Sequence, residues 1–444
     1  MGELRGLLGL AVLLGFAVAV SKNRAGIRWR TIVAALGLQF AFAALVLRWG
    51  PGRSALDWLS GKVETLIGYA RDGTEFVFGP LTGVGEQGET IFALRVLPVI
   101  IFLGALIGLL FYFRVIQYAT YVIGGAISWL LRVSKVESMY ASVVIYLGQS
   151  EAPLMIAPYL RSLRTAQLFT VMTAGFAAAA GSTLVGYSVL GAPLEYLLAA
   201  TVMNAPAALV MAKIMWPDST SEPEDSEYVA DRDGDEARRD GGTDAADEDG
   251  GETDSGTGSP DEIDVRSVRD QESTNAIDAV GRGALAGAKI AVTVGGLLIA
   301  FIAMIAMANG ILGGVGGWFG YEGLTFEKIL GWALSPLAWL LGVPWSEAVE
   351  AGSYIGQKTI LNEFVAFAAF GPEVGNLSGL TVVIVTFALA GFANLSSIAI
   401  QIGTIGSLVP ERRSQVAQLG LRALLAGGLA NLANAAIAGL VAVT

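Results

Sequence analysis

The chain has 444 residues, of which 54% are hydrophobic, and its formal net charge is −11. It contains no cysteine and no histidine, which excludes disulfides, thiolate metal sites, haem held by these residues and histidine proton relays. Ser–His and HExxH intramembrane protease sites are excluded for the same reason, and the GxGD motif of membrane aspartyl proteases is absent. We therefore expect a protein that is not an enzyme and carries no cofactor.

Apolar stretches of about 18 residues or more recur along the chain and predict transmembrane helices. They cover residues 4–20, 31–47, 92–113, 168–190, 195–215, 288–312, 377–405 and 415–443. About eight such helices with short connections make an all-α polytopic membrane protein.

Two further apolar regions are interrupted by polar residues and predict re-entrant helical hairpins. Residues 139–160 are broken by Gly148 and Pro153, and residues 345–370 carry Lys358 and Glu363 near their middle. Each arm is too short to cross about 30 Å of hydrocarbon, because a helix rises about 1.5 Å per residue. The backbone at such a tip is tolerated only where it lines protein or a water-filled cavity.

The distribution of basic residues predicts the orientation of the chain. Lys and Arg cluster in 22–30, 114–135, 161–164 and 412–413, and the positive-inside rule assigns these segments to the cytoplasm. Basic residues between 48 and 71 then fall outside and count against this arrangement. On balance we expect the N- and C-termini outside, the first hairpin entering from inside and the second from outside.

The two halves of the chain follow the same order. In each, a broken hairpin containing a glutamate is followed by a span interrupted by small polar residues and then by a further span. The run AGFA follows Glu151 at residue 174 and follows Glu363 at residue 390. Together with the opposite entry of the hairpins, this order predicts an inverted repeat, which is typical of secondary transporters that bind their substrate at the repeat interface.

This organisation predicts five parts of the chain. They are scaffold helices and interfacial segments in 1–136, a first transport repeat with hairpin 1 in 137–216, an acidic disordered cytoplasmic linker in 217–275, a scaffold helix and interfacial segment in 276–344, and a second transport repeat with hairpin 2 in 345–444. Between residues 218 and 264, nineteen Asp and Glu stand against three Arg, which predicts disorder. The linker is either a solvated connection or a regulatory or docking tail.

Glu151 and Glu363 are the strongest functional signal, because an ionisable side chain at membrane depth costs about 2.5–3.5 kcal/mol. We expect the two carboxylates, one from each hairpin, to meet near the middle of the membrane and bind a ligand. The alternative is a structural ion pair, for which Lys358 is a candidate partner of Glu363.

Other polar residues fall near the centres of the two interrupted spans. Thr183 lies in the span 168–190, and Asn394 and Ser397 lie with Phe392 in the span 377–405. Serine and threonine often bond back to their own helix, whereas a buried asparagine wants up to four hydrogen bonds and is expected to contact a ligand. Acceptors and neutral donors beside one aromatic ring suit an uncharged, hydroxyl-bearing solute that contains a ring.

The sequence resembles the concentrative nucleoside transporter family. The resemblance rests on GQSEAPL at 148–154, GQKTILNEFVAF at 356–367, GFANLSSIAIQIG at 391–403 and PERRSQVAQLGLRAL at 410–424. The second motif matches the family's G-x-K-x-x-x-N-E-F-V-A signature, and the resemblance covers nearly all of the chain except the acidic linker. It implies a homotrimer in the cytoplasmic membrane, with a scaffold and a mobile transport domain, that uses a cation gradient to concentrate nucleosides by alternating access.

The resemblance also implies which residues of the first repeat bind the nucleobase. Gln149, Ser150 and Glu151 on the first hairpin should face the base. Thr183 should lie where the interrupted span approaches the base. Many members of the family have threonine at the position of Ser150, which is linked to purine or pyrimidine preference, so this preference is left open.

The second repeat is implied to bind the sugar. Glu363 on the second hairpin, with Asn394 and Ser397, should hold the ribose hydroxyls. Phe392 should pack near the sugar or the base.

Two positions depart from the sodium-coupled members of the family. Those members carry an asparagine five residues before the glutamine of the first motif and a serine in the following span. Here the corresponding residues are Val144 and Ala178. Because sodium wants several oxygen ligands, the missing side-chain oxygens leave both the proton and sodium open as the coupling cation.

Other classes of function also remain open. A nucleoside-sensing membrane receptor could signal through the acidic linker, although no recognisable effector domain is attached. A channel is disfavoured, because paired hairpins suggest alternating access. The expected partners are the nucleoside, the lipid bilayer and further copies of the chain, and no nucleic acid.

Overall fold

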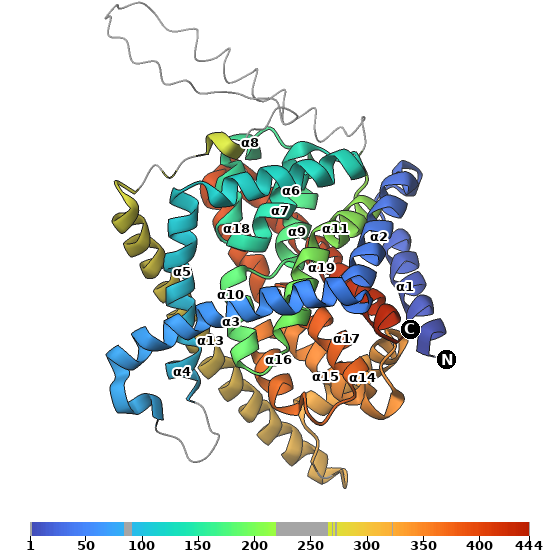
Figure 1. Cartoon of the computed structure of the whole chain (residues 1–444). Helices are drawn as coiled ribbons and strands as arrows, with labels where there is room; N and C mark the ends of the chain where they lie inside the picture. Colours follow the sequence, from blue (N-terminus) through green and yellow to red (C-terminus); the bar gives the residue numbers. More distant parts are fainter. Residues whose placement is uncertain are drawn as a thin grey trace, which may run out of the picture.

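The structure, a computed structural model, describes residues 2–83, 91–218, 265–268, 270, 273–321 and 323–443. Within these residues all regular elements are helices and no strand is present, which confirms the expected all-α fold (Figure 1). Most of the predicted acidic linker, 217–275, lies outside the described residues.

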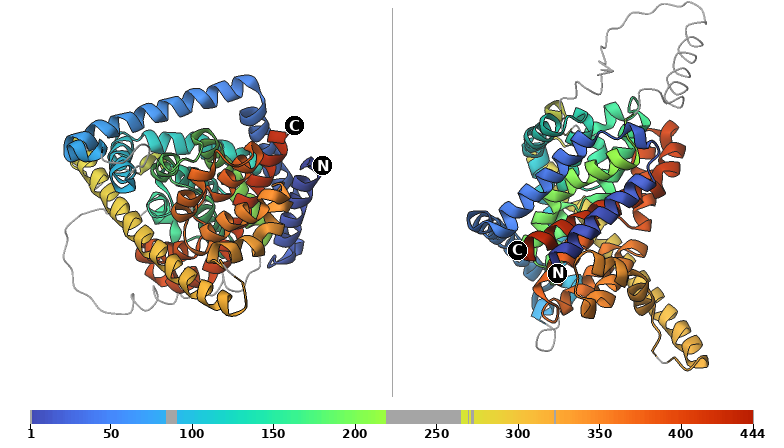
Figure 2. Two further views of the ribbon diagram at one scale, coloured as in Figure 1. Left: turned by 90° about the horizontal axis from the view of Figure 1, so that it is seen from below. Right: turned by 90° about the vertical axis from the view of Figure 1, so that its right-hand side faces the viewer.

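The first part of the chain forms the outer helices. They are α1 (Gly2–Ala19), α2 (Trp29–Ala43), which continues as the short π-helix Ala44–Arg48, α3 (Gly50–Phe78), α4 (Phe92–Arg95), α5 (Leu97–Tyr112) and α6 (Val115–Leu131). Helix α3 crosses the front of the bundle in Figure 1 and runs along one edge of the molecule in Figure 2. Helices α5 and α6 meet at a bend of 77°.

The first repeat follows directly. It contains α7 (Lys135–Leu147), a 3-10 helix (Ala152–Ile156), α8 (Ala157–Leu160), α9 (Thr165–Ala177), α10 (Gly181–Val189) and α11 (Leu194–Met215). The second part of the chain contains α13 (Ala276–Trp318), α14 (Phe326–Leu340), α15 (Trp345–Ile360), α16 (Glu363–Phe370), α17 (Gly379–Leu389), α18 (Leu395–Leu408) and α19 (Arg413–Val443). The sequence α15 to α19 repeats the order of α7 to α11: a broken hairpin, a broken helix and a continuous helix.

Two of the expected spans are interrupted in the structure, as the small polar residues near their centres predict. Five described helices are long and apolar enough to cross a membrane, or seven if each bent pair counts as one span. The predicted span 168–190 is divided into α9 and α10, and 377–405 is divided into α17 and α18. The span 288–312 is the middle of the much longer α13, whose first turn is capped by Asn275. Hydropathy alone detects apolar length and does not detect where a helix unwinds.

Both predicted hairpins are broken where polar residues interrupt them. Helix α7 ends before Gly148, and two residues separate the end of α15 at Ile360 from the start of α16 at Glu363. The second arm of the first hairpin begins as a 3-10 helix with Pro153 in its first turn, a position that proline tolerates because the N–H there has no partner within the helix. In Figure 1, α7 and α8 lie toward the top and α15 and α16 toward the bottom, as expected for hairpins that enter from opposite sides.

The AGFA match between the two halves does not coincide with the structural repeat. Residues 174–177 form the last turn of α9, whereas residues 390–393 lie in the break between α17 and α18. Counted from the helix that follows each break, Ala180 corresponds to Asn394. The repeat is therefore real in its order of elements, while this four-residue match is a coincidence of an Ala- and Gly-rich chain.

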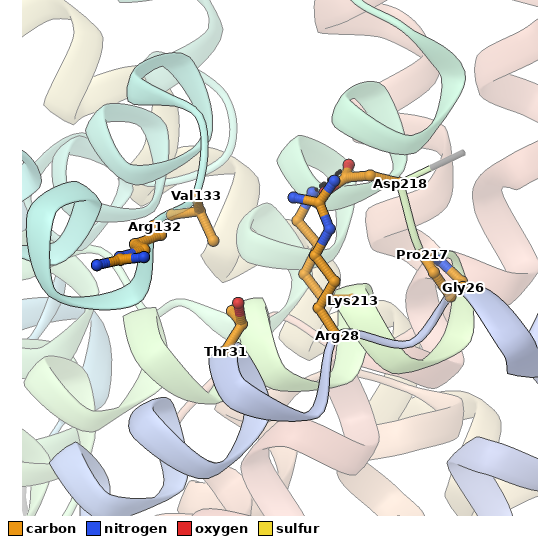
Figure 3. Close-up of a pocket in the computed structure, with 8 residues that line it drawn as sticks. All are labelled: Gly26, Arg28, Thr31, Arg132, Val133, Lys213, Pro217 and Asp218. Carbon is orange, nitrogen blue, oxygen red and sulfur yellow. Dashed lines mark hydrogen bonds and ion pairs between the residues drawn. The ribbon is translucent and has the colours of Figure 1, made fainter. Parts of the chain in front are cut away.

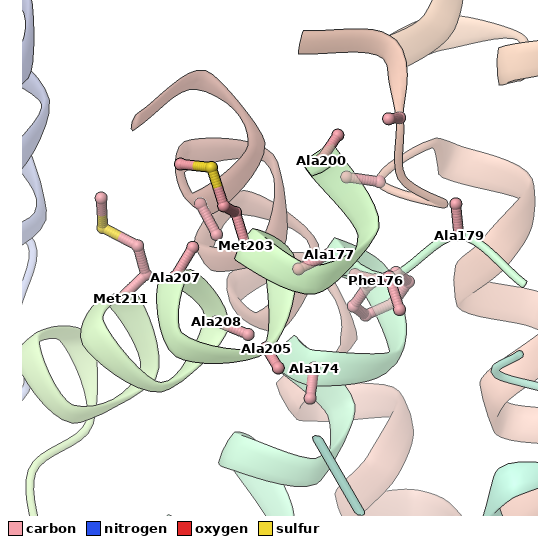
Figure 4. Packing of buried hydrophobic residues seen from close by; sticks show 14 of the residues in the cluster. Ala174, Phe176, Ala177, Ala179, Ala200, Met203, Ala205, Ala207, Ala208 and Met211 are labelled. Atoms are coloured by element: carbon pink, nitrogen blue, oxygen red, sulfur yellow. The ribbon is translucent and has the colours of Figure 1, made fainter. Parts of the chain in front are cut away.

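Small side chains form the centre of the molecule. Helices α9 and α11 pack against each other and against α19. Figure 4 shows that most of the buried side chains at the junction of α9 and α11 are alanines, including Ala174, Ala177, Ala205 and Ala208. Small residues allow helix backbones in membranes to approach closely. This packing holds the two breaks next to each other.

Glycines bring α5 and α13 into close contact. A Cβ atom on Gly104 would lie 2.5 Å from the carbonyl oxygen of Gly283, and one on Gly108 would lie 2.7 Å from the carbonyl oxygen of Ala279. Gly104 and Gly108 are four residues apart, as are Gly283 and Gly287, which is the small-residue spacing of packed membrane helices.

Candidate solute-binding site

The breaks in α9/α10 and α17/α18 contact each other. The backbone N–H of Phe392 donates to the carbonyl oxygen of Ala178 at 3.0 Å, which joins the unwound segment of one repeat to that of the other. An interrupted helix leaves N–H and C=O groups without partners in their own helix. At membrane depth most of these groups must find hydrogen-bond partners in other parts of the protein. Those that face a cavity can instead bind and orient a ligand.

Two buried asparagines satisfy carbonyl groups at the breaks. The Asn431 side-chain nitrogen donates to the carbonyl oxygen of Ala177 at 2.8 Å, and that of Asn204 donates to the carbonyl oxygen of Ala390 at 2.7 Å. Asn431 also donates to the side-chain oxygen of Asn204 at 3.1 Å. Since Asn204 lies on α11 and Asn431 on α19, each repeat supports the break of the other. A Cβ on Gly391 would collide with the Asn431 amide, so this position must be glycine.

Lys358 belongs to this support and not to an ion pair with Glu363. Its ammonium donates to the Asn431 side-chain oxygen at 2.9 Å and to the carbonyl oxygen of Ala388 at 3.2 Å. No ion pair joins Lys358 to Glu363 among the described residues. The structural alternative considered for Glu363, pairing with Lys358, is therefore wrong for this structure.

Glu363 lies at the first residue of α16 and is 5% exposed. Its Oε2 accepts a hydrogen bond from the Asn394 side-chain nitrogen at 2.7 Å, and its Oε1 accepts one from the Tyr187 hydroxyl at 3.2 Å. Asn394 is the N-cap of α18, and its oxygen accepts from the backbone N–H of Ser397 at 2.9 Å. The carboxylate of hairpin 2 is thus held at the N-termini of two helices, α16 and α18.

Tyr187 is held by rings of the second hairpin. Its ring stacks on Phe367 with centroids 4.4 Å apart and makes an edge contact with Phe364 at 4.8 Å. All three side chains are buried. This packing fixes the hydroxyl that donates to Glu363.

Gln149 connects the first hairpin to α18. Its side-chain nitrogen donates to the Ser397 hydroxyl oxygen at 2.8 Å, and its oxygen accepts from the Gln401 side-chain nitrogen at 3.2 Å. Because Ser397 also donates its backbone N–H to Asn394, one continuous set of hydrogen bonds runs from Gln149 through Ser397 and Asn394 to Glu363. The two hairpins are therefore linked through α18.

The remaining predicted residues lie outside this set of hydrogen bonds. Ser150 is exposed, and Glu151 is partly exposed. Within the residues that the structure describes, Glu363 accepts hydrogen bonds from Asn394 and Tyr187, and the expected meeting of Glu151 and Glu363 around a ligand stays a prediction. The Thr183 hydroxyl bonds back to the carbonyl oxygen of Ala180 at 2.9 Å, and Phe392 is buried.

The two residues at which the resemblance implies a departure from sodium-coupled members are buried and apolar. Val144 is 1% exposed and Ala178 is 2% exposed. The carbonyl oxygen of Ala178 already accepts the N–H of Phe392. In the described parts of the chain, no group of three or more Asp and Glu residues could hold a metal ion.

A separate pocket lies beside the first repeat and is too small for a solute. Figure 3 shows its lining, which includes Arg28, Arg132, Lys213 and Asp218. The Lys213 ammonium lies 2.6 Å from the carboxylates of both Glu137 and Asp218. With a volume of about 10 Å³, the pocket has room for no more than a water molecule. Its charged groups act as a structural clamp.

Several buried polar residues of the site escaped the sequence prediction. They are Tyr187, Asn204, Gln401 and Asn431. The role of Lys358 as a donor to Asn431 was also not predicted. Gln401 lies inside the GFANLSSIAIQIG motif, one helical turn after Ser397, and Tyr187 lies one turn after Thr183. The signal that could have found them is the presence of an amide or a phenol inside an apolar span, where a partner on another helix is required.

Comparison with known proteins gives consistent matches along the chain. Residues 196–439 match the family model "Na+ dependent nucleoside transporter C-terminus", and residues 8–81 match that of the N-terminus. Residues 93–194 match a model described as "Nucleoside recognition". Together these models cover both repeats of the site.

Individual relatives match over almost their whole length. The chain is 48% identical to the uncharacterized transporter YutK of Bacillus subtilis, covering 99% of this chain and 100% of that protein. It is 40% identical to the nucleoside permease NupC of Helicobacter pylori, covering 98% and 96% of the two chains. The solved structure of CNTnw in an inward-facing substrate-bound state is 43% identical, with a TM-score of 0.86 over 99% of this chain and 98% of that one. This protein is therefore a multi-pass membrane protein that belongs to the concentrative nucleoside transporter family.

Proposed function

We propose that this protein is a cation-coupled nucleoside symporter that works by alternating access in the cytoplasmic membrane. The observation that carries the proposal is the hydrogen-bonded set Gln149–Ser397–Asn394–Glu363, which spans the two oppositely placed hairpins. Its residues lie in the motifs by which the sequence resembles the family. A relative named as a nucleoside permease and a substrate-bound CNTnw structure support the same conclusion.

The chemistry of the set suits a nucleoside. Glu363 presents carboxylate oxygens, each with further lone pairs, that would accept the ribose hydroxyls, while Asn394 and Ser397 would donate to the ribose oxygens. Gln149 would face the base, with Ser150, Glu151 and Thr183 nearby and Phe392 against the ring. An analogue that lacks a ribose hydroxyl would leave a buried acceptor unpaired, at a cost of about 1–3 kcal/mol.

Alternating access would move the two repeats together against the scaffold. We assign 137–216 and 345–444 to the mobile part and 1–136 and 276–344 to the scaffold. The homotrimer implied by the sequence motifs would cover part of the apolar surface of α13, where Ile299 is 75% exposed and Trp318 is 84% exposed. The mass of the protein purified in detergent tests this assembly.

We propose the proton as the coupling cation, with sodium as the alternative. Two side-chain oxygens of the sodium-coupled members are replaced by the buried side chains of Val144 and Ala178. Each positive charge that enters across 100 mV contributes about 2.3 kcal/mol, enough for roughly 50-fold accumulation of a nucleoside. The name of the matching family model makes sodium the alternative to be tested.

Uptake into proteoliposomes tests the proposal. We expect labelled uridine or adenosine to accumulate when an inward proton gradient is imposed in sodium-free buffer, and to leak out when a protonophore removes the gradient. Accumulation that requires sodium at constant pH would refute proton coupling and retain symport. If neither nucleoside accumulates under either gradient, the proposed transport function is wrong.

The proposed orientation can be tested because the chain has no native cysteine. Ser162→Cys lies in the exposed turn between α8 and α9, and Gly375→Cys lies in the exposed turn between α16 and α17. In intact cells a membrane-impermeant maleimide should label the second variant only. Labelling of Ser162→Cys only would show that the chain has the opposite orientation in the membrane.

A further inference from the structure

Gln401 has a fixed amide orientation. It lies on α18, is 1% exposed, and its side-chain nitrogen donates to the backbone carbonyl oxygen of Met172 at 3.0 Å. The same nitrogen donates to the side-chain oxygen of Gln149 at 3.2 Å. The oxygen and nitrogen of an amide side chain have nearly the same shape, so their hydrogen bonds decide which is which. A backbone carbonyl can only accept, so the nitrogen of Gln401 must face Met172.

The orientation of Gln401 determines that of Gln149. Because Gln401 donates, the atom of Gln149 that faces it must be the oxygen. The nitrogen of Gln149 then faces the Ser397 hydroxyl oxygen, which accepts its hydrogen bond at 2.8 Å. Ser397 therefore keeps its own hydroxyl proton for donation, and Gln149 keeps its second N–H. This side of the site presents donors, whereas Glu363 presents acceptors.

The geometry points to Gln401 as a positioning residue that determines base specificity: through Gln149 it requires a hydrogen-bond acceptor on the edge of the nucleobase. This inference rests on the proposed nucleoside-binding function. The ligand class it selects is a nucleoside whose base carries a ring nitrogen or carbonyl oxygen where Gln149 reaches it. A base with only C–H groups at that edge would leave a buried N–H unpaired.

The orientation of the Gln401 amide leaves one of its polar atoms without a hydrogen bond. Its side-chain oxygen is buried and has no hydrogen-bond partner among the described residues, and the same is true of the Tyr140 hydroxyl. The Gln401 amide and the Tyr140 hydroxyl lie beside Gly175, where a Cβ would be 2.6 Å from the Gln401 nitrogen and 3.3 Å from the Tyr140 oxygen. Reversing the amide would place its oxygen against two other oxygens, those of Met172 and Gln149. The amide is therefore kept in one orientation although its oxygen is unpaired.

Two variants remove the hydrogen bond from Gln401 that fixes the orientation of the Gln149 amide, and neither changes a residue proposed to touch the ligand. Gln401→Leu has similar volume and removes both donated hydrogen bonds. Gly175→Ala places a methyl group where the Gln401 amide now lies and displaces it. The matched control is Gln39→Leu, because Gln39 is also 1% exposed, donates only to Ala35 of its own helix, and has a side-chain oxygen without a partner in the described structure.

Equilibrium binding of base analogues to the purified full-length protein measures the effect. The probes are adenosine with its 3-deaza and 7-deaza analogues and cytidine with its 3-deaza analogue, which each exchange one ring nitrogen for C–H. Wild type and Gln39→Leu should prefer a parent nucleoside over at least one of its deaza analogues by about tenfold or more, since tenfold corresponds to about 1.4 kcal/mol. In Gln401→Leu and Gly175→Ala this ratio should fall to within about twofold of one.

The ratio between adenosine and 3′-deoxyadenosine serves as an internal reference. It reports on the ribose side at Glu363 and should stay at its wild-type value in both variants. The inference is overturned if a folded variant keeps the wild-type deaza ratios, or if wild type binds the nucleosides but distinguishes none of the analogues. Failure of wild type to bind any nucleoside would instead refute the proposed function. Gel filtration and the thermal transition identify folded variants. If Gln401→Leu does not fold, the deaza ratios of Gly175→Ala test the inference.

Discussion

The Asn394 amide donates to the Glu363 carboxylate at 2.7 Å and thereby joins the first turns of α18 and α16. The Tyr187 hydroxyl donates to the other carboxylate oxygen at 3.2 Å. Both neighbours are donors, so the site is built around an acceptor with two equivalent oxygens. A hydroxyl-bearing ligand can bind to the lone pairs that these two donors leave unused.

Glu363→Gln should abolish gradient-driven uptake and lower nucleoside affinity at least about tenfold, because the amide offers one acceptor oxygen where the carboxylate offers two. The protein should remain folded, since the side chain keeps its size. Nucleoside binding and proteoliposome uptake measure the effect. Glu350→Gln is the control, because Glu350 lies on α15 and accepts the Tyr354 hydroxyl at 2.8 Å away from the site. Near-normal uptake by Glu363→Gln would contradict the role given to this residue.

Tyr187→Phe should raise the nucleoside KM about fivefold to thirtyfold, because it removes one hydrogen bond to the carboxylate, worth about 1–2 kcal/mol, while keeping the ring that stacks on Phe367. Initial uptake rates over a range of nucleoside concentrations give the KM. Tyr354→Phe removes a similar Tyr–Glu hydrogen bond outside the site and keeps the contact of Tyr354 with Phe370. Equal KM changes in the two variants would show that the effect of Tyr187 is not specific to the site.

Lys213→Met should lower the thermal stability in detergent strongly. Lys213 and Glu137 have side chains only 5% and 1% exposed, so the variant leaves a buried carboxylate without its cation. Breaking one partner of a buried ion pair costs about 3–5 kcal/mol. The melting temperature followed by tryptophan fluorescence measures the loss. Lys328→Met, which removes an exposed ammonium that bonds the carbonyl oxygen of Gly323, should change little. Equal melting temperatures for the two variants would argue against the clamp.

Gly283→Ala should destabilise the contact between α5 and α13. Its Cβ would collide with the carbonyl oxygen of Gly104, and overpacking of this kind costs about 1–3 kcal/mol. Gly281→Ala on the same helix is the matched control, because a Cβ there meets nothing within 4 Å. The difference in melting temperature between the two variants isolates the contact. A stable Gly283→Ala variant would mean that α5 and α13 are packed less closely than described.

The sequence was sufficient to locate the main landmarks of the chain. Hydropathy identified the apolar helices, and the polar interruptions near Gly148 and Glu363 identified the breaks of the two hairpins. Asn394 could be singled out because a buried amide requires partners, and its side chain donates to Glu363 and accepts from the backbone N–H of Ser397. These predictions succeed because burial in lipid and helix capping depend on residues that are near each other in the chain.

The tertiary structure decided which polar groups meet. Gln149 bonds Ser397 across 248 residues and Gln401 across 252 residues, a link between the first hairpin and α18 that the sequence did not predict. Tyr187 reaches Glu363 from 176 residues away. Such contacts depend on the rotation and depth of each helix, which follow from the packing of small residues between helices and are not encoded in any local stretch of sequence.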